Sequence, residues 1–215
     1  MRQRAVTPSG RARHAQRLPA AERRQALLDA AMRVFACGSY SGATTADIAR
    51  EAGVSEPILY RHFASKRDLY LAVLDTAWER LRAAWEEAVA DAAPEEMLPA
   101  LGRVVRELKV RRNVTPPSLL WIQALTEAGE DPAIRRHLRA QLRAVHDFVA
   151  ETMRTAQARG GMARDRDPDA EAWIFLGAGL LIGFGVRLGE LLSAEDVERI
   201  GAARLRWLSA PESGP

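Results

Sequence analysis

The sequence of 215 residues predicts an all-α protein built from successive helices. Alanine, leucine, arginine and glutamate dominate the chain, and the apolar residues recur at the spacing of a helix with 3.6 residues per turn. Runs that alternate valine, isoleucine or threonine with polar residues, which would indicate strands, are absent from the sequence. Residues that suit helix ends occur between the apolar stretches. These observations favour a helical bundle.

The first two helices are bounded by residues that start or stop helices. One helix begins near Pro19, because proline fits a first turn, and ends near Gly38. Thr44 caps a short helix, and Asp47 can reach back to the amide of the cap. Gly53 ends this short helix. We therefore expect a long helix and then a short one.

A second short helix follows Ser55, which is a favourable cap, and it carries Pro57 in its first turn. Ser65 and Asp68 repeat the capping pattern and begin a long helix that Pro94 breaks. Beyond Pro94 the pattern predicts a bundle, with helices near residues 95–110, 117–128, 132–159, 169–191 and 194–209.

Composition places the chain among soluble proteins of the cytoplasm. Apolar residues make up 47% and charged residues 27%, which is ordinary for a globular domain. The single cysteine, Cys37, excludes an internal disulfide and fits a reducing compartment. The longest apolar run, 172–186, contains four glycines and is shorter than the roughly 20 residues that cross a bilayer. No membrane segment and no secretory signal are expected.

Positive charge is concentrated near the N-terminus. Residues 1–70 hold 12 Lys and Arg against 6 Asp and Glu, whereas the remainder holds 19 against 22. This asymmetry suggests that the N-terminal part faces a polyanion. Residues 1–18 contain five arginines and no acidic residue, so we expect a flexible basic arm. The arm either enters a minor groove of DNA or is a solvated tail.

The two short helices carry the steric pattern of a helix-turn-helix. Ala49 is small enough to let the second helix approach the first, and Gly53 tolerates the left-handed backbone of a sharp turn. Val54 and Leu59 would fill the interior of the pair, with Ile48 behind them. An alanine-rich helical hairpin without a DNA-binding role could show the same pattern.

The residues around this pattern resemble the DNA-binding segment of the tetracycline-repressor (TetR) family. The resemblance covers about residues 22–80 and departs from the family pattern at Ser39, where glycine is usual, and at Glu56-Pro57, where lysine-glycine is frequent. The matching residues are Phe35, Tyr40, Ala43-Thr44-Thr45, Ile48-Ala49, Val54 to Phe63, Ser65-Lys66 and Leu69 to Leu74.

The resemblance implies a three-helix DNA-binding head, with its helix-turn-helix, on a C-terminal helical ligand-binding and dimerisation bundle. The expected division is a basic flexible arm at 1–18, a DNA-binding domain at 19–80, and an effector-binding and dimerisation domain at 81–215. The expected partners are double-stranded operator DNA, an unidentified small-molecule effector and a second copy of the chain. The implied function is a ligand-responsive repressor of transcription that binds a palindromic operator as a dimer.

DNA contacts are expected from the helix-turn-helix and its flanks. Tyr60, His62 and Lys66 match family phosphate ligands, and each can donate to a phosphate oxygen. Thr44 and Thr45 begin the first short helix, where a hydroxyl and helix N-terminal amides can contact the same strand.

Base contacts are expected from the start of the second short helix. Arg61 suits guanine, Glu56 suits the amino group of cytosine, and Ile58 suits the methyl group of thymine. Ser55 and Pro57 lie on the same edge. Glu56 could instead serve the helix dipole or exclude wrong sequences, since its charge repels phosphates.

The body offers two further candidate sites. Gly179 and Gly183, with Leu180 and Phe184 beside them, form a small-residue face that packs against either the partner subunit or the core of the bundle itself. The resemblance implies an effector pocket inside the bundle. Aromatic and sulfur-containing residues of the predicted helices are candidates for its lining: Trp85, Trp121, Phe148, Met153 and Trp173.

Other classes of protein are less well supported by the sequence. It contains no glycine-rich phosphate loop and no HExxH, CxxC or GxSxG motif, so we expect neither an enzyme nor a metal or cofactor site. His137 and His146 are nine residues apart and fall on opposite helix faces. The remaining alternatives are a sequence-independent DNA-binding architectural protein and an interaction module whose basic arm binds acidic partners.

Overall fold

The computed structural model describes residues 19–110, 117–189 and 191–209, and all regular secondary structure in this part of the chain is helical. The prediction of an all-α fold is therefore confirmed. The predicted basic arm at 1–18 lies outside the described residues. The helices are α1 Ala20–Cys37, α2 Thr45–Glu51, α3 Glu56–Tyr60, α4 Lys66–Ala90, the 3-10 turn η1 Pro94–Glu96, α5 Met97–Val110, α6 Pro117–Glu130, α7 Pro132–Ala158, α8 Pro168–Arg187 and α9 Ala194–Leu208.

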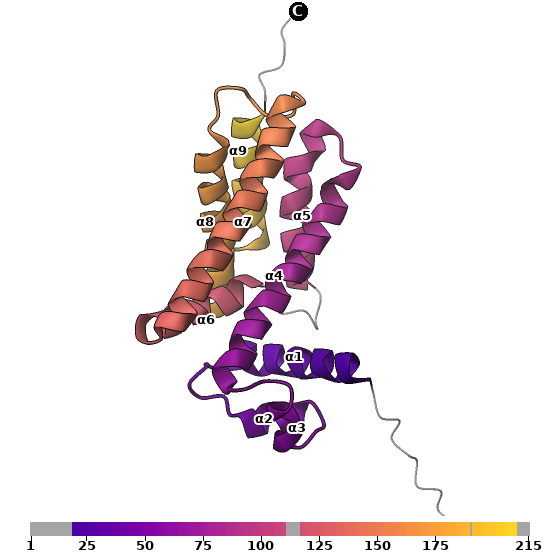
Figure 1. The fold of residues 1–215 in the computed structure, drawn as a ribbon. Coiled ribbons are helices and arrows are strands. Elements are labelled where there is room, and N and C mark those ends of the chain that lie inside the picture. The colour runs from indigo at the N-terminus through magenta and orange to yellow at the C-terminus, as the bar shows by residue number, and fades with distance from the viewer. Residues whose placement is uncertain (1–18, 111–116, 190, 210–215) are drawn as a thin grey trace, which may run out of the picture.

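The helices are arranged as a small head and an elongated body. Figure 1 shows α1, α2 and α3 at one end of the molecule, with α5 to α9 forming the body beyond them. Aromatic rings fill the head: Phe35 of α1 meets Tyr70 of α4 edge to face, with 4.8 Å between ring centroids. Tyr40 packs on Tyr70 at 4.7 Å. The head thus has its own interior, closed by the first turns of α4.

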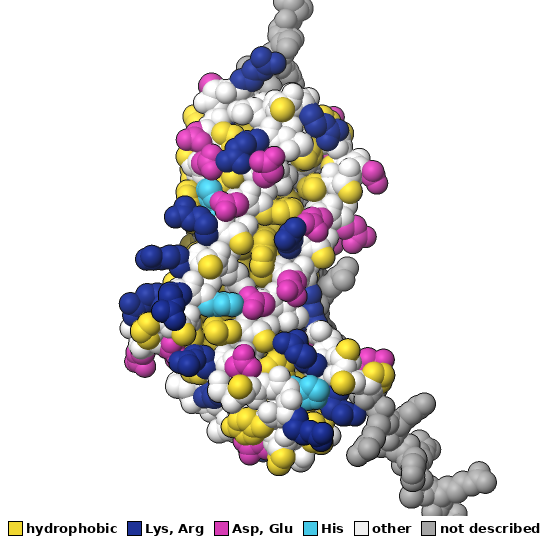
Figure 2. Space-filling model, viewed as in Figure 1, with side chains coloured by type: hydrophobic (Ala, Val, Ile, Leu, Met, Phe, Trp, Pro, Cys, Tyr) yellow, Lys and Arg dark blue, Asp and Glu magenta, His cyan; other side chains and the backbone are white. Residues whose placement is uncertain are grey.

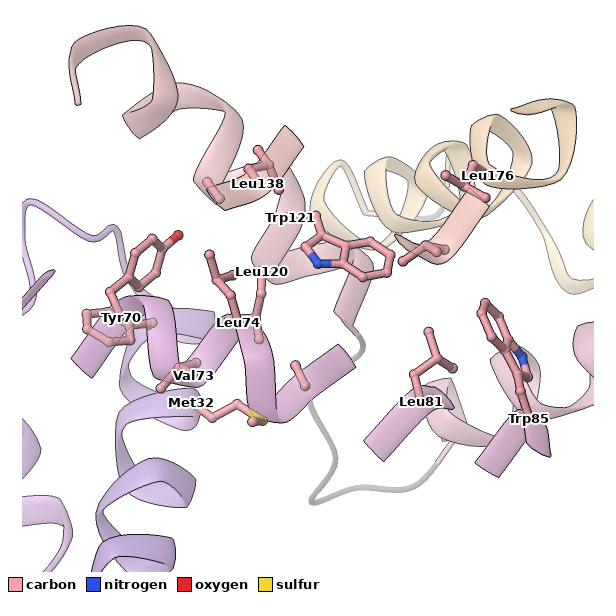
Figure 3. Close-up of a cluster of buried hydrophobic side chains, with 14 of the residues drawn as sticks. Met32, Tyr70, Val73, Leu74, Leu81, Trp85, Leu120, Trp121, Leu138 and Leu176 are labelled. Carbon is pink, nitrogen blue, oxygen red and sulfur yellow. The ribbon is translucent and has the colours of Figure 1, made fainter. Parts of the chain in front are cut away.

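Helix α4 belongs to both parts. Its 25 residues rise by about 37 Å, and its buried side runs from Leu69 in the head to Trp85 in the body. Figure 3 shows this buried cluster extending from Met32 and Tyr70 to Trp85, with Trp121 of α6 and Leu176 of α8 packed against it. The expected boundary between residues 80 and 81 falls inside this helix, so head and body share a rigid element.

Helix ends agree with the sequence prediction where a local cap forms. Thr44 and Asp47 form the predicted capping box of α2, and the Ser65 hydroxyl accepts from the amide of Asp68 at the start of α4. Ser55 precedes α3 but makes no side-chain cap hydrogen bond. Helix α8 ends at Arg187 rather than 191, because the chain turns at Gly189 with φ +64°.

None of the helices in the described part of the chain combines the length and apolar character needed to cross a membrane.

Candidate functional site

The turn between α2 and α3 has the geometry of a helix-turn-helix. Gly53 has φ +67°, and the next amide, that of Val54, donates to the carbonyl of Ala49 at 2.9 Å. Ala49 is 2% exposed where the helices meet, while Ile48 and Leu59 are fully buried. The small residue, the left-handed glycine and the apolar plugs therefore occupy the places that the sequence pattern predicts.

The outer edge of α3 carries most of the residues predicted to contact DNA. Ser55, Pro57, Tyr60 and Arg61 are exposed, whereas Leu59 on the inner side of the same helix has no exposed surface. Ile58 and His62 are half-buried on the flanks. The head forms the lower end of the molecule, and Figure 2 shows several Lys and Arg side chains on that end. This edge is accessible to a large anionic partner.

Thr45 contacts two of the other residues that were predicted to touch DNA. The hydroxyl of Thr45 donates to the carboxylate of Glu56 and lies 3.1 Å from the phenol oxygen of Tyr60. Thr45 is 8% exposed, so its hydroxyl faces α3 rather than solvent. The sequence suggested an outward-facing Thr45, but periodicity does not reveal that a carboxylate on the next helix lies within reach. Glu56 thus bridges α2 and α3.

Thr44 is occupied by its role as a cap. Its hydroxyl lies 2.6 Å from Oδ2 of Asp47, and Asp47 also pairs with Arg50 at 2.5 Å. The hydrogen bonds from Thr44, and then that from Arg50, hold the pKa of the Asp47 carboxyl below its usual range. An ionised carboxylate therefore keeps the N-terminus of α2 fixed at neutral pH.

Lys66 is the first residue of α4. Its ammonium group sits 4.5 Å from the centroid of the Tyr40 ring and 3.4 Å from the carbonyl oxygen of Ser41. A cation held over an aromatic face keeps its charge while its stem is restrained. Sequence patterns could not predict this contact, because residues 40 and 66 meet only in the folded head.

The body contains two cavities that bear on the predicted effector site. A small one of about 50 Å³ is lined by Trp85 and Trp121 among others, and a larger one of about 220 Å³ lies between α5, α8 and α9 and includes Met153. Phe148 stacks on Trp85 at 5.7 Å and supports the wall of the small cavity.

The prediction that Trp173 lines a pocket is wrong for these two cavities. Trp173 is 45% exposed and stacks on the buried ring of His146, with 4.3 Å between centroids, and it lines neither cavity. The aromatic character of Trp173 suggested an interior position, but its ring covers the buried His146 of α7 from the solvent side. The sequence analysis also missed Glu171 and Arg204, which line the larger cavity.

Gly183 of α8 packs closely against α6 of the same subunit. A Cβ added to Gly183 would lie 2.8 Å from Ile122 and 3.0 Å from Ser118 of α6, and Gly179 lines both cavities. Of the two alternatives that the sequence left open for Gly183, the core of the bundle itself is the one observed. Its predicted role at a dimer interface is therefore corrected: glycine is needed there so that α8 can approach α6.

A different face of α8 carries exposed apolar side chains. Leu180 is half-buried and lines the small cavity, whereas Phe184 lies exposed on the outer face of the helix. The exposed members of this outer apolar face are Trp173, Leu181, Phe184 and Leu188. Large apolar patches of this kind mark interaction surfaces.

Polar contacts connect α6 to the head. The amide of Gln123 donates to the carbonyl of Gly38 at 2.7 Å, just past the end of α1. Two residues earlier on α6, the indole of Trp121 donates to Gln141 at 2.6 Å, and Gln141 donates to Asp75 of α4 at 3.3 Å. A wall of the small cavity is thus linked both to α1 and to α4. These pairs are far apart in sequence, so local patterns could not reveal them.

Within residues 19–110, 117–189 and 191–209, no group of three or more His, Cys, Asp or Glu could hold a metal ion. His137 lies 2.8 Å from Asp75, and His146 lies 2.9 Å from Asp147.

Comparison with known proteins agrees with this geometry. Residues 27–73 match the family model described as bacterial regulatory proteins, tetR family. The chain is 54% identical over 67 residues to the HTH-type transcriptional activator FasR of Mycolicibacterium smegmatis, an alignment that covers 31% of this chain and 31% of the activator. Because this alignment covers only about a third of the relative's length, it supports a similarity of the head alone.

Solved structures match most of the chain. A TetR-family transcriptional regulator from Rhodococcus sp. superposes with a TM-score of 0.77 at 26% identity, covering 88% of this chain and 100% of that one. A transcriptional regulator from Saccharomonospora viridis in complex with choline gives 0.72 at 25% identity, covering 87% of this chain and 95% of that one. The match therefore includes the body as well as the head. Residues 27–73 therefore match the DNA-binding segment of the tetR family, and the described chain as a whole resembles TetR-family transcriptional regulators in its fold.

Proposed function

We propose that the protein is a sequence-specific DNA-binding repressor of transcription that binds a palindromic operator as a homodimer and responds to a small-molecule effector. The observation that carries the DNA-binding part is the contrast between the two sides of α3. Arg61 is exposed on its outer side, and Leu59 is fully buried on its inner side by a turn that requires Gly53. Such a helix can enter a major groove without unpacking the head.

Each exposed side chain has a chemical role in this proposal. Arg61 and Ile58 read base edges, while Tyr60, His62 and Lys66 donate to phosphates on the flanks. Glu56 does not read a base, because its carboxylate is engaged by Thr45 across the helix-turn-helix. It holds α3 against α2 through Thr45, whose hydroxyl also lies 3.1 Å from the phenol oxygen of Tyr60.

Dimerisation follows from the outer apolar face of α8. Burial of these side chains against a second copy removes apolar surface from water. Each large side chain that becomes fully buried stabilises the dimer by about 1.5–3 kcal/mol. Two heads related by a twofold axis would meet half-sites about 34 Å apart on the same side of the duplex. The proposed interface uses Trp173, Leu181, Phe184 and Leu188.

The effector response is assigned to α6. A ligand that moves the cavity wall at Trp121 also moves Gln123, whose amide is bonded to the carbonyl of Gly38 at the end of α1. Because α1 packs on α2, such a movement changes the orientation of the helix-turn-helix. An effector acts only if it binds one orientation more tightly than the other.

Selection of bound sequences from a random DNA pool tests the DNA-binding proposal. We expect a pair of inverted half-sites, with a preference of about 10³-fold or more over random duplex. If the protein instead retains unrelated DNA sequences equally well, the result would support the alternative of a sequence-independent architectural DNA-binding protein. A reporter gene carrying the selected site then distinguishes repression from activation, which matters because the relative FasR is named an activator.

A further inference from the structure

The larger cavity has walls that are suited to an apolar ligand. It has a volume of about 220 Å³ and lies between α5, α8 and α9. Most of its lining is apolar, including Leu101, Phe175 and Ile200. An apolar cavity of about 150 Å³ accommodates benzene, so this one has room for on the order of ten non-hydrogen atoms.

Its one carboxylate is already neutralised by the protein. Glu171 is 7% exposed, lies against the guanidinium of Arg204 and accepts from the indole of Trp207 at 3.0 Å. To bind a cationic ligand, Glu171 would have to give up Arg204, and an arginine left unpaired in a half-buried place is costly. The cavity is therefore poorly suited to a cation.

Two further guanidiniums of α5 line the same cavity. Arg103 pairs with Glu96 at 2.8 Å. Arg106 also lines the cavity and forms no ion pair within the part of the chain that the structure describes. Three arginines against one carboxylate make the lining positive. The cavity therefore combines an apolar interior with an arginine available to an anionic group.

The position of Arg106 suggests how such a ligand lies. Arg106 is eight residues beyond Leu98, which corresponds to about 12 Å along α5, and both residues line the cavity. An acid with its carboxylate at Arg106 can therefore extend its apolar part along α5. A carboxylate can accept two parallel hydrogen bonds from one guanidinium, which fixes its direction.

We propose that this cavity binds a small organic acid, an aryl-alkyl or medium-chain carboxylate, with its carboxylate on Arg106 and its carbon skeleton against the walls of α5, α8 and α9. The inference rests on the proposed effector role of the body, because Phe175 and Gly179 line both this cavity and the small one whose wall includes Trp121. It is independent of which DNA sequence the head recognises.

Calorimetric titration of the full chain tests the proposal with octanoate, 3-phenylpropanoate, octanamide and choline as probes. We expect both acids to bind, and octanamide to bind at least about tenfold more weakly, because it lacks the charge-assisted hydrogen bonds. Choline should not bind. Equal binding of octanoate and octanamide, or binding of choline without the acids, would overturn the proposal.

A substitution identifies the residue responsible. Arg106→Gln should reduce the preference for octanoate over octanamide to near unity, whereas Arg136→Gln, the same charge change at an exposed site on α7, should leave it unchanged. An unaltered preference in Arg106→Gln refutes the assignment. DNA selection on the same preparation separates the two hypotheses: a selected operator without acid binding overturns only the ligand proposal, and acid binding without an operator overturns only the DNA-binding proposal.

Discussion

Replacing Gly53 by alanine tests the turn on which the DNA-binding edge depends. An added Cβ at Gly53 would meet no atom within 4 Å, so the substitution introduces no steric overlap with neighbours. The backbone, however, has φ +67°, where an L-residue other than glycine is disfavoured by about 1–2 kcal/mol. The whole cost of Gly53→Ala therefore comes from the backbone conformation.

This cost can be measured as a change in melting temperature. For chains of 150–250 residues, 1 kcal/mol corresponds to a shift of about 2–4 °C, so Gly53→Ala should lower Tm by about 2–8 °C. Gly53→Asn should lose less, because asparagine tolerates the left-handed region better than alanine. Circular dichroism at 222 nm or calorimetry reports the shift.

A second glycine provides a control of opposite sign. Gly129 lies within α6, has no atom within 4 Å of an added Cβ and does not have a positive φ. Gly129→Ala should therefore keep or raise Tm, since alanine is favoured over glycine in a helix by about 0.5–1 kcal/mol. If Gly53→Ala melts at the same temperature as the parent chain, or shifts in step with Gly129→Ala, the turn does not require glycine and the reasoning fails.

The other predictions concern DNA, assembly and pH. Lys66→Ala should weaken binding to all sequences alike and reduce the salt slope by about 1 per subunit, whereas Arg61→Ala should relax preference at particular bases; anisotropy titrations with matched and mismatched duplexes separate the two effects. Leu181→Asp should weaken dimerisation by at least about 100-fold, because two copies each lose about 1.5–3 kcal/mol of apolar burial, and an unchanged sedimentation profile would count against the α8 interface. The pKa of the Asp47 carboxyl is lowered in the folded protein, chiefly by its hydrogen bond with Thr44. The ionised carboxylate therefore contributes to the free energy of unfolding above about pH 4, and this contribution is lost as the pH falls through the folded-state pKa. Asp47→Asn should therefore flatten the acid side of the stability profile, and a profile identical to that of the parent chain would argue against this role.

Much of the head could be predicted because its determinants are local. Thr44 and Asp47 are three residues apart, and Gly53 is four residues beyond Ala49, so one turn of helix brings the relevant groups together. The same is true of the boundaries of α4, where Ser65 caps the first turn. Within such distances, sequence spacing alone determines which groups meet.

The partners of individual side chains could not be predicted in this way. Periodicity places Gly183 on a face of α8 but does not reveal that Ser118 and Ile122 of α6 cover it. Likewise, Glu171 and Arg204 are 33 residues apart and meet only because α8 and α9 lie antiparallel. Contacts of this kind depend on how helices pack against one another, which helix spacing does not specify.

In the proposed complex, the exposed edge of α3 enters the major groove of the operator. Methylation of guanine N7, which lies in that groove, tests it directly once a selected site is available. We expect that methylated guanines inside both half-sites prevent binding and that Arg61→Ala abolishes the effect at one position in each half-site. Binding that is indifferent to N7 methylation throughout the selected site would show that α3 does not enter the major groove.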